Sequence, residues 1–443
     1  MTADYRTQIE QASTLFADAI LAASWALTPD ALEVDATVRD LLRQVGLGTM
    51  QRVLRTRAQQ ATQQAQAATG LGVERCPTVT VVSVFGPVAV ASPYRWDPGC
   101  QQGVRPVATM RGLTHGRRSL ATERALTAFG AEESFGQAAK RFTEHYGWPV
   151  GRTTILRVVE GHAVGAEDYV HRRLAASRGA FDEPAGVRPG AARLLTALDG
   201  CEIRTGTLVP HPEGGTTPVR QRPRRQRREE WRDVRVGFVR KLDEVERTYV
   251  ARLDRYEVLV GQLVDAAVAR GLSSRTETIA VAAGGNGLRE ELAAQLPNLR
   301  FIYDRPHLKQ HFYEAAEAIG LKEGARHRWV DERIHRLDHG QRDAVLAGLD
   351  RHKGRGKKRV TQLRKHLARF ADAVHYEAFR EAGLPTGSGE VESAHRYIPQ
   401  KRLKLPGASW LPATLNPRLA LRVMRANEWW DDYCVSRRQR AVA

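Results

Sequence analysis

The sequence predicts an α/β domain with a helical insertion, preceded by mostly helical regions that contain a β-hairpin. Three observations support this prediction. Between residues 190 and 303, short apolar runs of strand length alternate with segments whose apolar residues recur at helical spacing. Residues 4–69, 119–162 and 321–382 also have helical periodicity. Residues 78–90 are rich in Val and Thr around a Phe-Gly-Pro sequence, which is typical of a hairpin.

Three modules are expected before the α/β layer. Residues 1–70 form a helical region, and residues 71–118 contain the hairpin. Residues 119–185 fit a helix-turn-helix domain, because Ser134 can cap one helix and a second helix begins near Arg152 after a Tyr-Gly-Trp-Pro break. Four side chains at the start of that second helix would meet phosphates and base edges of DNA: Arg152, Thr153, Thr154 and Arg157. Many ordinary helical hairpins share this pattern.

The α/β layer is expected at residues 186–320. Its predicted strands are 194–199, 202–209, 234–239, 248–253, 278–282 and 299–303, and its predicted helices are 256–270 and 288–295. An order of several strands followed by a helix, a strand, a helix and a strand suits a ribonuclease-H-like domain. A basic loop at 210–230 interrupts the layer, residues 321–385 form a basic helical insertion, and residues 386–443 form the closing helices.

The chain is strongly basic, with 68 Lys and Arg against 50 Asp and Glu, and a net charge of +18. Such a charge predicts a polyanionic partner, double-stranded DNA, although a basic surface from a GC-rich genome is the alternative. The arginine run that ends at residue 228 has too few apolar residues to fold alone, and it is expected to be a mobile arm on DNA or a solvated loop. Candidate DNA contacts outside the helix-turn-helix are Arg220, Arg222, Arg224, Arg225, Arg227, Arg228, Lys357, Lys358, Arg396 and Arg402.

Cysteine usage and hydropathy exclude several classes of protein. The four cysteines are far apart and form no Cys-x-x-Cys pair, which argues against a zinc ribbon or a disulfide framework and fits a reducing cytoplasm. No run of about 18 apolar residues is present, and the N-terminus has no signal-peptide pattern, so no membrane partner is expected. The expected location is the bacterial cytoplasm, in association with the nucleoid.

Two carboxylates lie where a metal-dependent phosphodiester chemistry would need them. Asp199 follows a buried apolar run and is expected to sit at a strand end, in a tight Asp-Gly turn. Glu392 follows a Gly-Ser-Gly turn at a helix start, and it is favoured over Glu390, which lies in the turn that enters the helix. Cleavage and strand transfer use two divalent metals, Mg²⁺ or Mn²⁺, held by about three carboxylates. Taken singly, an Asp-Gly is usually only a turn, and a Glu at a helix start is usually a dipole partner.

From about residue 80 to the C-terminus, the chain resembles bacterial insertion-sequence transposases of the ISKra type, distant relatives of the Mutator-like transposases with a DDE triad. Residues 387–393, Gly-Ser-Gly-Glu-Val-Glu-Ser, resemble the block that carries the family's third catalytic acid, which falls on Glu392. Asp199 matches the first catalytic acid. Asp304 and His307 match the family's Asp-x-x-His and would be accessory residues. The Glu block is the specific part of the match, whereas the Asp-Gly and the helix-turn-helix are weak signals alone.

The chain departs from the family at the second catalytic acid. Where the family has Asp-Gly-Ala/Gly-x-Gly-Leu, residues 283–288 are Ala-Gly-Gly-Asn-Gly-Leu, so Ala283 occupies the aspartate position. A methyl group cannot ligate a metal, and the chain is therefore expected to be inactive. A deliberate Asp→Ala substitution and a natural loss of activity both explain this, and the first also explains why the rest of the motif is intact. Asp304 is a further candidate for the second acid.

The resemblance implies a DDE transposase that binds terminal inverted repeats and target DNA, and that acts as a homodimer or a higher oligomer. It would cut and join DNA with Mg²⁺ or Mn²⁺ at Asp199, position 283 and Glu392. A non-catalytic, transposase-derived regulator that binds specific DNA is the alternative. An RNA-processing nuclease of the same fold is disfavoured, because aromatic residues make up only 7% of the chain and are scattered.

Overall fold

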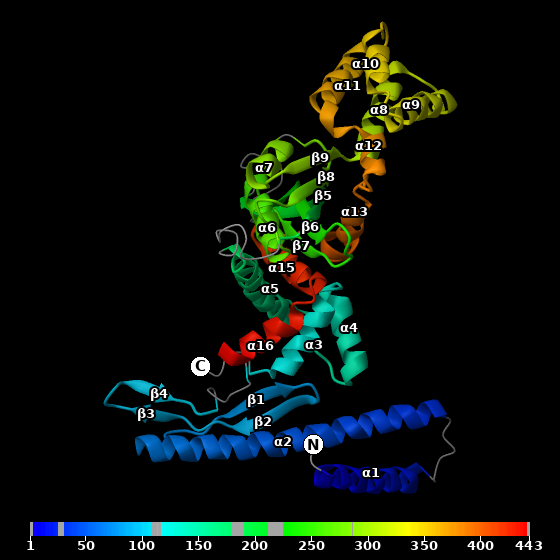
Figure 1. Ribbon diagram of the computed structural model, residues 1–443. Coiled ribbons are helices and arrows are strands. Elements are labelled where there is room, and N and C mark those ends of the chain that lie inside the picture. The colour runs from blue at the N-terminus through cyan, green and yellow to red at the C-terminus, as the bar shows by residue number, and fades with distance from the viewer. Residues whose placement is uncertain are drawn as a thin grey trace, which may run out of the picture. The chain divides into compact units, whose positions relative to one another are not determined.

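The computed structural model (Figure 1) describes residues 3–24, 31–107, 113, 117–178, 190–210, 225–285 and 287–440. The chain divides into two compact units. The first comprises Met1–Gly130, Ser134–Val158 and Cys434–Ala443, and the second comprises Ala131–Glu133 and Val159–Tyr433. The second unit contains a five-stranded mixed sheet, so the architecture is mixed α/β.

The first unit begins with a helical region and the hairpin, as the apolar spacing predicts. Its elements are α1 (Ala3–Ser24), α2 (Ala31–Thr69), β1 (Thr78–Ser83), β2 (Gly86–Ala91), β3 (Arg95–Asp97) and β4 (Gln102–Val104). Strands β1 and β2 pair in antiparallel fashion. Leu54 and Ala58 of α2 are buried with Val81, Val88 and Val90 of the hairpin. Because strand side chains alternate between faces, the three valines share one face, and α2 packs against it.

Three helices follow: α3 (Leu120–Gly130), α4 (Phe135–Tyr146) and α5 (Arg152–Ala175). The side chain of Ser134 accepts a hydrogen bond from the backbone N–H of Gln137, which satisfies one of the free donors at the start of α4. Gly147 ends α4 at φ +69, a left-handed conformation that glycine adopts without a steric penalty. The indole N–H of Trp148 donates to the backbone oxygen of Val84 at 2.9 Å, so the turn before α5 is bonded to the turn of the hairpin.

The sheet of the second unit has the order β7-β6-β5-β8-β9. Its strands are β5 (Arg193–Pro210), β6 (Arg225–Lys241), β7 (Thr248–Arg252), β8 (Glu277–Ala282) and β9 (Leu299–Tyr303). Strands β5, β6 and β7 are antiparallel neighbours, whereas β8 and β9 run parallel to β5. Helices α6 (Tyr256–Ala269) and α7 (Leu288–Gln295) connect the last three strands in sequence. Each predicted strand from residue 234 onward is present, with ends that differ by a few residues at most in β7, β8 and β9.

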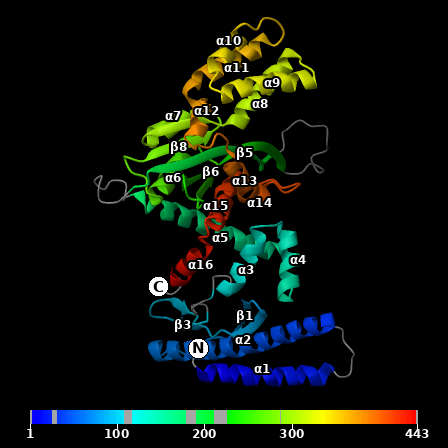
Figure 2. The same ribbon diagram turned by 45° about the vertical axis from the view of Figure 1, so that its right-hand side comes forward.

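Strand β5 corrects one sequence prediction. Asp199 was expected in a tight turn between two strands, but β5 continues through Asp199 and Gly200 without interruption. Strand β6 supplies a backbone partner for every residue from Leu194 to Pro210, and this pairing keeps the Asp-Gly pair extended. The basic loop was expected at 210–230, but Pro210 belongs to β5 and residues 225–230 belong to β6, because the two strands pair as far as Pro210↔Arg225. Figure 2 shows β5 and β6 as long neighbouring strands beside the short β8.

Helices cover both faces of the sheet. Leu263 of α6 lies against Gly237, whose missing side chain makes room for it, so α6 covers the face that includes Gly237. Asp199 pairs with Val236, one residue from Gly237, and its side chain therefore lies on the opposite face. Helix α13 (Gly389–His395) packs on that second face, where His395 bonds to the backbone of Asp199.

The helical insertion and the closing helices complete the second unit. They are α8 (Arg305–Ile319), α9 (Glu323–Asp338), α10 (Arg342–Asp350), α11 (Lys357–Arg369), α12 (Tyr376–Glu381), α13, α14 (Lys401–Leu403), α15 (Leu415–Ala426) and α16 (Trp430–Arg440), whose last residues belong to the first unit. Val330, Leu363 and Leu367 are buried within the insertion. In the parts of the chain that the structure describes, no helix has the length and apolar character needed to cross a membrane.

Candidate active site

The candidate site lies where the parallel strands β8 and β9 end, beside the middle of β5. Leu198, Ala282 and Tyr303 are in register across the three strands. The next residue on each strand path is Asp199, Ala283 and Asp304, respectively. The backbone N–H of Asp304 still donates to the backbone oxygen of Ala282, at 3.0 Å, so the alignment extends one residue beyond β9. Parallel register thus places the three sequence-predicted positions beside one another, Asp199 within β5 and the other two directly after β8 and β9.

Asp304 is fully buried, and both of its carboxylate oxygens are engaged. Oδ1 accepts the backbone N–H of Ser388 at 2.6 Å. Oδ2 accepts the backbone N–H of His307 at 3.0 Å and faces His307 Nδ1 at 2.5 Å. Burial alone would raise the pKa of Asp304, but the bonds from His307 and Ser388 outweigh it and hold the pKa below its usual value. These contacts suit a group that orients His307 and the start of α13 better than a metal ligand, which needs free oxygen lone pairs.

His307 connects Asp304 with Asp199. Its Nδ1–H donates to Asp304, so its Nε2 faces outward and lies 3.8 Å from Oδ1 of Asp199. The hydrogen bond to Asp304 raises the pKa of His307, and the charges of Asp199 and Glu392 raise it further against the effect of burial. A ring held in this way presents one nitrogen to the space between the carboxylates.

His395, in the last turn of α13, is a site residue that the sequence reasoning missed. Its Nε2–H donates to the backbone oxygen of Asp199 at 3.3 Å, and its Nδ1 lies 3.7 Å from Oδ2 of the same residue. Burial lowers the pKa of His395, although the nearby carboxylate of Asp199 opposes the shift. The available signal was spacing, because His395 follows Glu392 by three residues and such pairs are neighbours on a helix surface.

Glu392 lies on the exposed side of α13. Its negative charge favours the protonated form of both His307 and His395, the two rings beside Asp199. Among the described residues, no hydrogen-bond or ion-pair partner engages the Glu392 carboxylate. Glu390 differs, because it forms ion pairs with Arg240 at 2.8 Å and Arg247 at 2.6 Å. Within the described part of the chain, Glu390 is thus held in ion pairs, whereas the Glu392 carboxylate is not.

Ala283 leaves one corner of this cluster without a ligand. It follows β8 directly and is partly exposed, and Gly284 after it packs closely against the rings of Tyr303 and Phe370. Within the described ranges, no three His, Cys, Asp or Glu side chains are arranged to hold a metal ion. Two carboxylates and a methyl group do not make a ligand set for a pair of divalent ions. The residues present therefore do not fit Mg²⁺ or Mn²⁺ as they stand.

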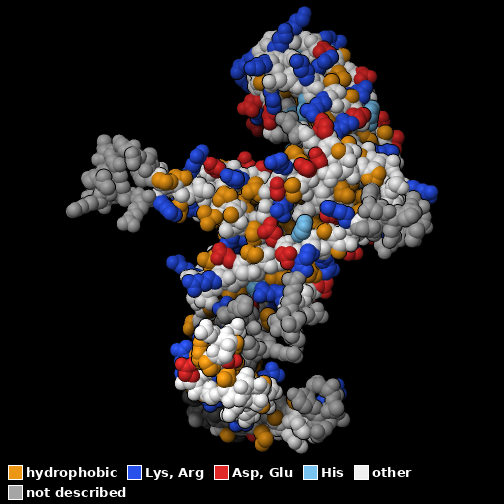
Figure 3. Space-filling view, turned by 90° about the vertical axis from the view of Figure 1, so that its left-hand side faces the viewer, with side chains coloured by type: hydrophobic (Ala, Val, Ile, Leu, Met, Phe, Trp, Pro, Cys, Tyr) orange, Lys and Arg blue, Asp and Glu red, His pale blue; other side chains and the backbone are white. Residues whose placement is uncertain are grey.

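The candidate DNA contacts are spread over both units. In the first unit, the start of α5 presents Arg152, Thr153 and Arg157 to solvent, and Thr154 is half-buried. In the second unit, the exposed basic candidates are Lys357 and Lys358 in the first turn of α11, Arg396 after α13, and Arg225, Arg227 and Arg228 in β6. Figure 3 shows Lys and Arg side chains over the helical insertion in the upper part of the view. Arg220, Arg222 and Arg224 lie outside the described residues.

Arg402 is the exception among these candidates. It is only 5% exposed, and its guanidinium lies 4.8 Å from the ring centre of Trp410. Burial, together with the nearby guanidinium groups of Arg418 and Arg422, lowers the pKa of Arg402 to about 10. A guanidinium packed inside the domain is not available to a phosphate at the surface, so its assignment as a DNA contact is corrected to a packing role.

Comparison with known proteins adds no relative from which function could be transferred. No known protein-family model matches the chain. No curated protein sequence matches it either. The site combines Asp199 in β5, His307 after the end of β9, and Glu392 and His395 of α13.

Proposed function

We propose that the chain is a DDE-type DNA transposase whose second catalytic acid is replaced by Ala283. One observation carries the proposal: register aligns Asp199 within β5 with Ala283 and Asp304 at the ends of β8 and β9, and helix α13, which carries Glu392, places His395 against Asp199. Residues more than 190 positions apart in sequence thus share one small region. Such convergence on rigid strand and helix ends is what a two-metal phosphoryl-transfer site needs.

The sheet supports a ribonuclease-H-like assignment for the second unit. Three antiparallel strands, a helix, a strand, a helix and a strand occur in the order that suits this fold, and the closing helix α13 carries Glu392. The helical insertion lies in sequence between the last strand and that helix. A helix that returns to the sheet after an insertion is how a distant acid reaches the first strand.

The charge distribution supports DNA as the substrate. The net charge of +18 favours a polyanionic partner. The basic side chains at the start of α5 and in α11 are exposed on helix surfaces, where phosphates can reach them. The capped α4, the left-handed Gly147 and α5 support a helix-turn-helix that reads terminal inverted repeats. Because two transposon ends must be held together, the proposal includes a homodimer or a higher oligomer.

Restoring the missing acid tests the proposal. The variant Ala283→Asp adds a carboxylate directly after β8, the strand that lies between β5 with Asp199 and β9, which Asp304 follows. It is expected to cleave duplex DNA that carries the sequences flanking the protein's own coding sequence, in the presence of Mg²⁺ or Mn²⁺. The unmodified chain and the double variant Ala283→Asp/Glu392→Gln serve as inactive controls. Binding of this DNA by Ala283→Asp without any metal-dependent cleavage would refute the assignment of the site.

A transposase-derived regulator that binds specific DNA without cutting it is the second candidate. The observation that favours it is Ala283 itself, which has no carboxylate although Asp199 and Asp304 on the neighbouring strand paths are both present. The residue encoded at position 283 in the parent gene separates the two candidates. An alanine there, with site-specific binding and no cleavage, supports the regulator, whereas an aspartate supports the transposase.

A further inference from the structure

Helix α2 is much longer than the apolar surface that covers it. Its 39 residues extend about 58 Å, whereas a helix of a globular protein typically has about 8–20 residues. The core that α2 shares with the β1–β2 hairpin runs only from Leu47 to Ala58, about 17 Å of that length. The first half of α2, before Leu47, takes no part in this core. A long helix of this kind is typical of a protein that pairs helices with a partner.

A second row of apolar side chains follows α2 on the side away from the hairpin. Val34, Val38 and Val45 are separated by four and seven residues, so helical spacing places them on one face. Val45 precedes Leu47 of the hairpin core by two residues, about 200° around the helix, and the row therefore faces away from the hairpin. Leu42 and Val45 are 52% and 53% exposed. We call this row the α2 stripe, and its members are Val34, Val38, Leu42, Val45 and Val53.

Helix α1 is also largely uncovered. It runs alongside α2 (Figure 1), yet among its side chains whose burial is described, Phe16 alone is not fully exposed. Ile9, Leu15 and Leu21 are in contact with solvent, and Leu15 is 72% exposed. Helices α1 and α2 together hold seven of the sixteen large apolar side chains that are exposed in the described part of the chain. Apolar surface concentrated in this way indicates an interaction site.

The charge of this region favours a protein partner over a nucleic acid. Residues 1–45 contain seven Asp and Glu against three Arg, in a chain with a net charge of +18. The next part of α2 has the opposite charge, because residues 46–69 contain Arg52, Arg55 and Arg57 and no acid. One helix thus has an acidic half and a basic half. A second copy in antiparallel orientation matches both halves at once, and this complementarity selects the chain itself as the partner.

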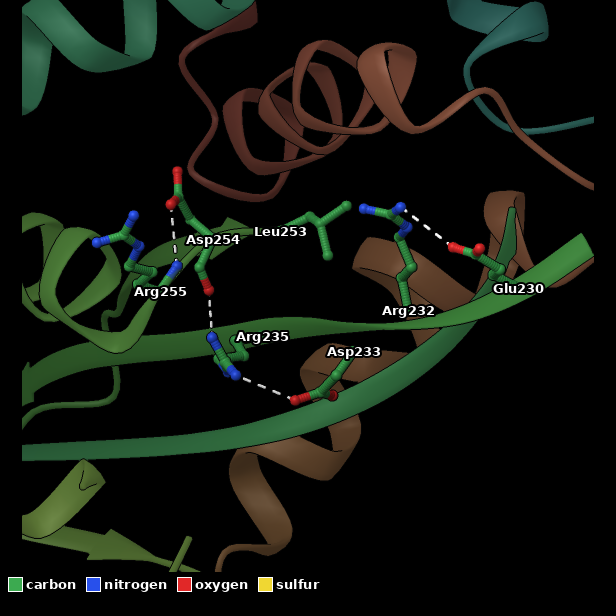
Figure 4. A pocket seen from close by; sticks show the side chains of 7 residues that line it. All are labelled: Glu230, Arg232, Asp233, Arg235, Leu253, Asp254 and Arg255. Atoms are coloured by element: carbon green, nitrogen blue, oxygen red, sulfur yellow. Dashed lines mark hydrogen bonds and ion pairs between the residues drawn. The ribbon is translucent and has the colours of Figure 1, made fainter. Parts of the chain in front are cut away.

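A groove in the second unit offers no comparable surface (Figure 4). Its volume is about 530 Å³, and its lining has three basic side chains, three acidic ones and a single leucine. Arg232 pairs with Glu230 at 3.2 Å, and Arg235 pairs with Asp233 at 3.4 Å and donates to the backbone oxygen of Asp254. These charged groups satisfy one another. The groove therefore has neither the net charge nor the apolar area that distinguishes α1 and α2.

We propose that α1 and the α2 stripe form the interface of a homodimer in which the two α2 helices pair in antiparallel orientation. With a two-fold axis near Val45, Val38 of each copy meets Val53 of the other, and the stripe provides about 29 Å of contact. Asp35 of each copy then lies opposite Arg57 of the other. The two α1 helices complete a four-helix bundle. This interface goes beyond the proposed function, because it does not depend on the chemistry of the candidate site, and it gives a location to the homodimer.

The test measures self-association of the full chain without DNA, by sedimentation equilibrium over a range of concentrations. The parent chain is expected to dimerise. Val45→Glu places two carboxylates against each other near the axis and should weaken dimerisation about a hundredfold. Because Val45 is exposed in the single copy, the variant should keep the circular dichroism spectrum and the Tm of the parent. Val245→Glu is the matched control, since Val245 is 82% exposed between β6 and β7, and it should leave dimerisation unchanged.

An exchange of charges tests the antiparallel orientation. Asp35→Arg and Arg57→Glu should each weaken dimerisation several-fold, because each places like charges opposite one another at both ends of the interface. Combined in one chain, the two substitutions restore pairs of opposite charge and should return the affinity to that of the parent. Parallel pairing would place Asp35 beside Asp35 of the other copy, and the combination would then give no rescue. That result would overturn the proposed arrangement.

Two other results would overturn the interface itself. One is a parent chain that stays monomeric at every concentration, in which case α1 covers the stripe of its own copy. The other is a dimer that Val45→Glu weakens no more than Val245→Glu does, because the copies would then meet elsewhere. Neither result bears on the assignment of the candidate site, which the cleavage assay of Ala283→Asp tests separately.

Discussion

Asp304 is expected to be the most sensitive single residue of the candidate site. Its carboxylate is fully buried and accepts the backbone N–H groups of Ser388 and His307 and the ring N–H of His307. Asp304→Ala leaves the two backbone donors without a partner inside the domain. At about 1–3 kcal/mol for each buried donor left unpaired, the free energy of unfolding should fall by roughly 2–6 kcal/mol. For a domain of ordinary stability, this is a large fraction of the total.

Asp304→Asn should cost less than Asp304→Ala. The amide oxygen still accepts one donor, while the amide NH₂ faces the other, so roughly half of the loss is expected, about 1–3 kcal/mol. The order is measured by urea unfolding at pH 7, followed by circular dichroism and tryptophan fluorescence. Asp343→Asn is the control, because Asp343 is exposed and its ion pair with Arg342 is screened by solvent. A cost below about 0.5 kcal/mol for Asp304→Ala would refute the reasoning that these bonds order the site.

Two further predictions concern the packing next to Ala283. Gly284→Ala should destabilise the protein by about 1–3 kcal/mol in urea unfolding, because a β-carbon at residue 284 would lie 2.5 Å from the Tyr303 ring. Gly389→Ala is the control and should be close to neutral, because a β-carbon at residue 389 would have no neighbouring atom within 4 Å. Burial lowers the pKa of His366 to about 4. Between about pH 6.5 and pH 4 the unfolded chain therefore binds a proton at His366 that the folded protein does not bind. The stability that the neutral imidazole contributes is present in full above about pH 6.5 and is lost as the pH falls toward 4. His366→Gln should therefore narrow the difference in unfolding free energy between pH 7 and pH 4.5 by up to ~2 kcal/mol, allowing for solvent screening; an unchanged difference would contradict the assigned pKa.

Sequence periodicity predicted the strands and helices around the candidate site well. The apolar run 278–282 and the following segment 299–303 correspond to β8 and β9, because buried parallel strands are continuous apolar runs bounded by turn residues. Local patterns of this kind depend only on neighbours along the chain.

Other features could not be predicted in this way. An Asp-Gly pair favours a turn locally, yet β5 stays extended at Asp199 because β6 supplies a backbone partner along its whole length. In the sequence, Arg402 cannot be told apart from a basic residue at the surface. In the structure its side chain is buried and its guanidinium packs against the ring of Trp410. His395 joins the site only because α13 returns to β5 after the helical insertion.

The amino-acid sequence by itself determined the excess of positive charge and most of the strands and helices, because both follow from residue type and spacing; the long pairing of β5 with β6 is the exception. Tertiary structure decided which of the acids and histidines meet. Register between β5, β8 and β9 sets Asp199, Ala283 and Asp304 side by side, and the docking of α13 adds Glu392 and His395. The arrangement of these side chains depends on contacts between residues far apart in the chain, and no local sequence pattern encodes such contacts.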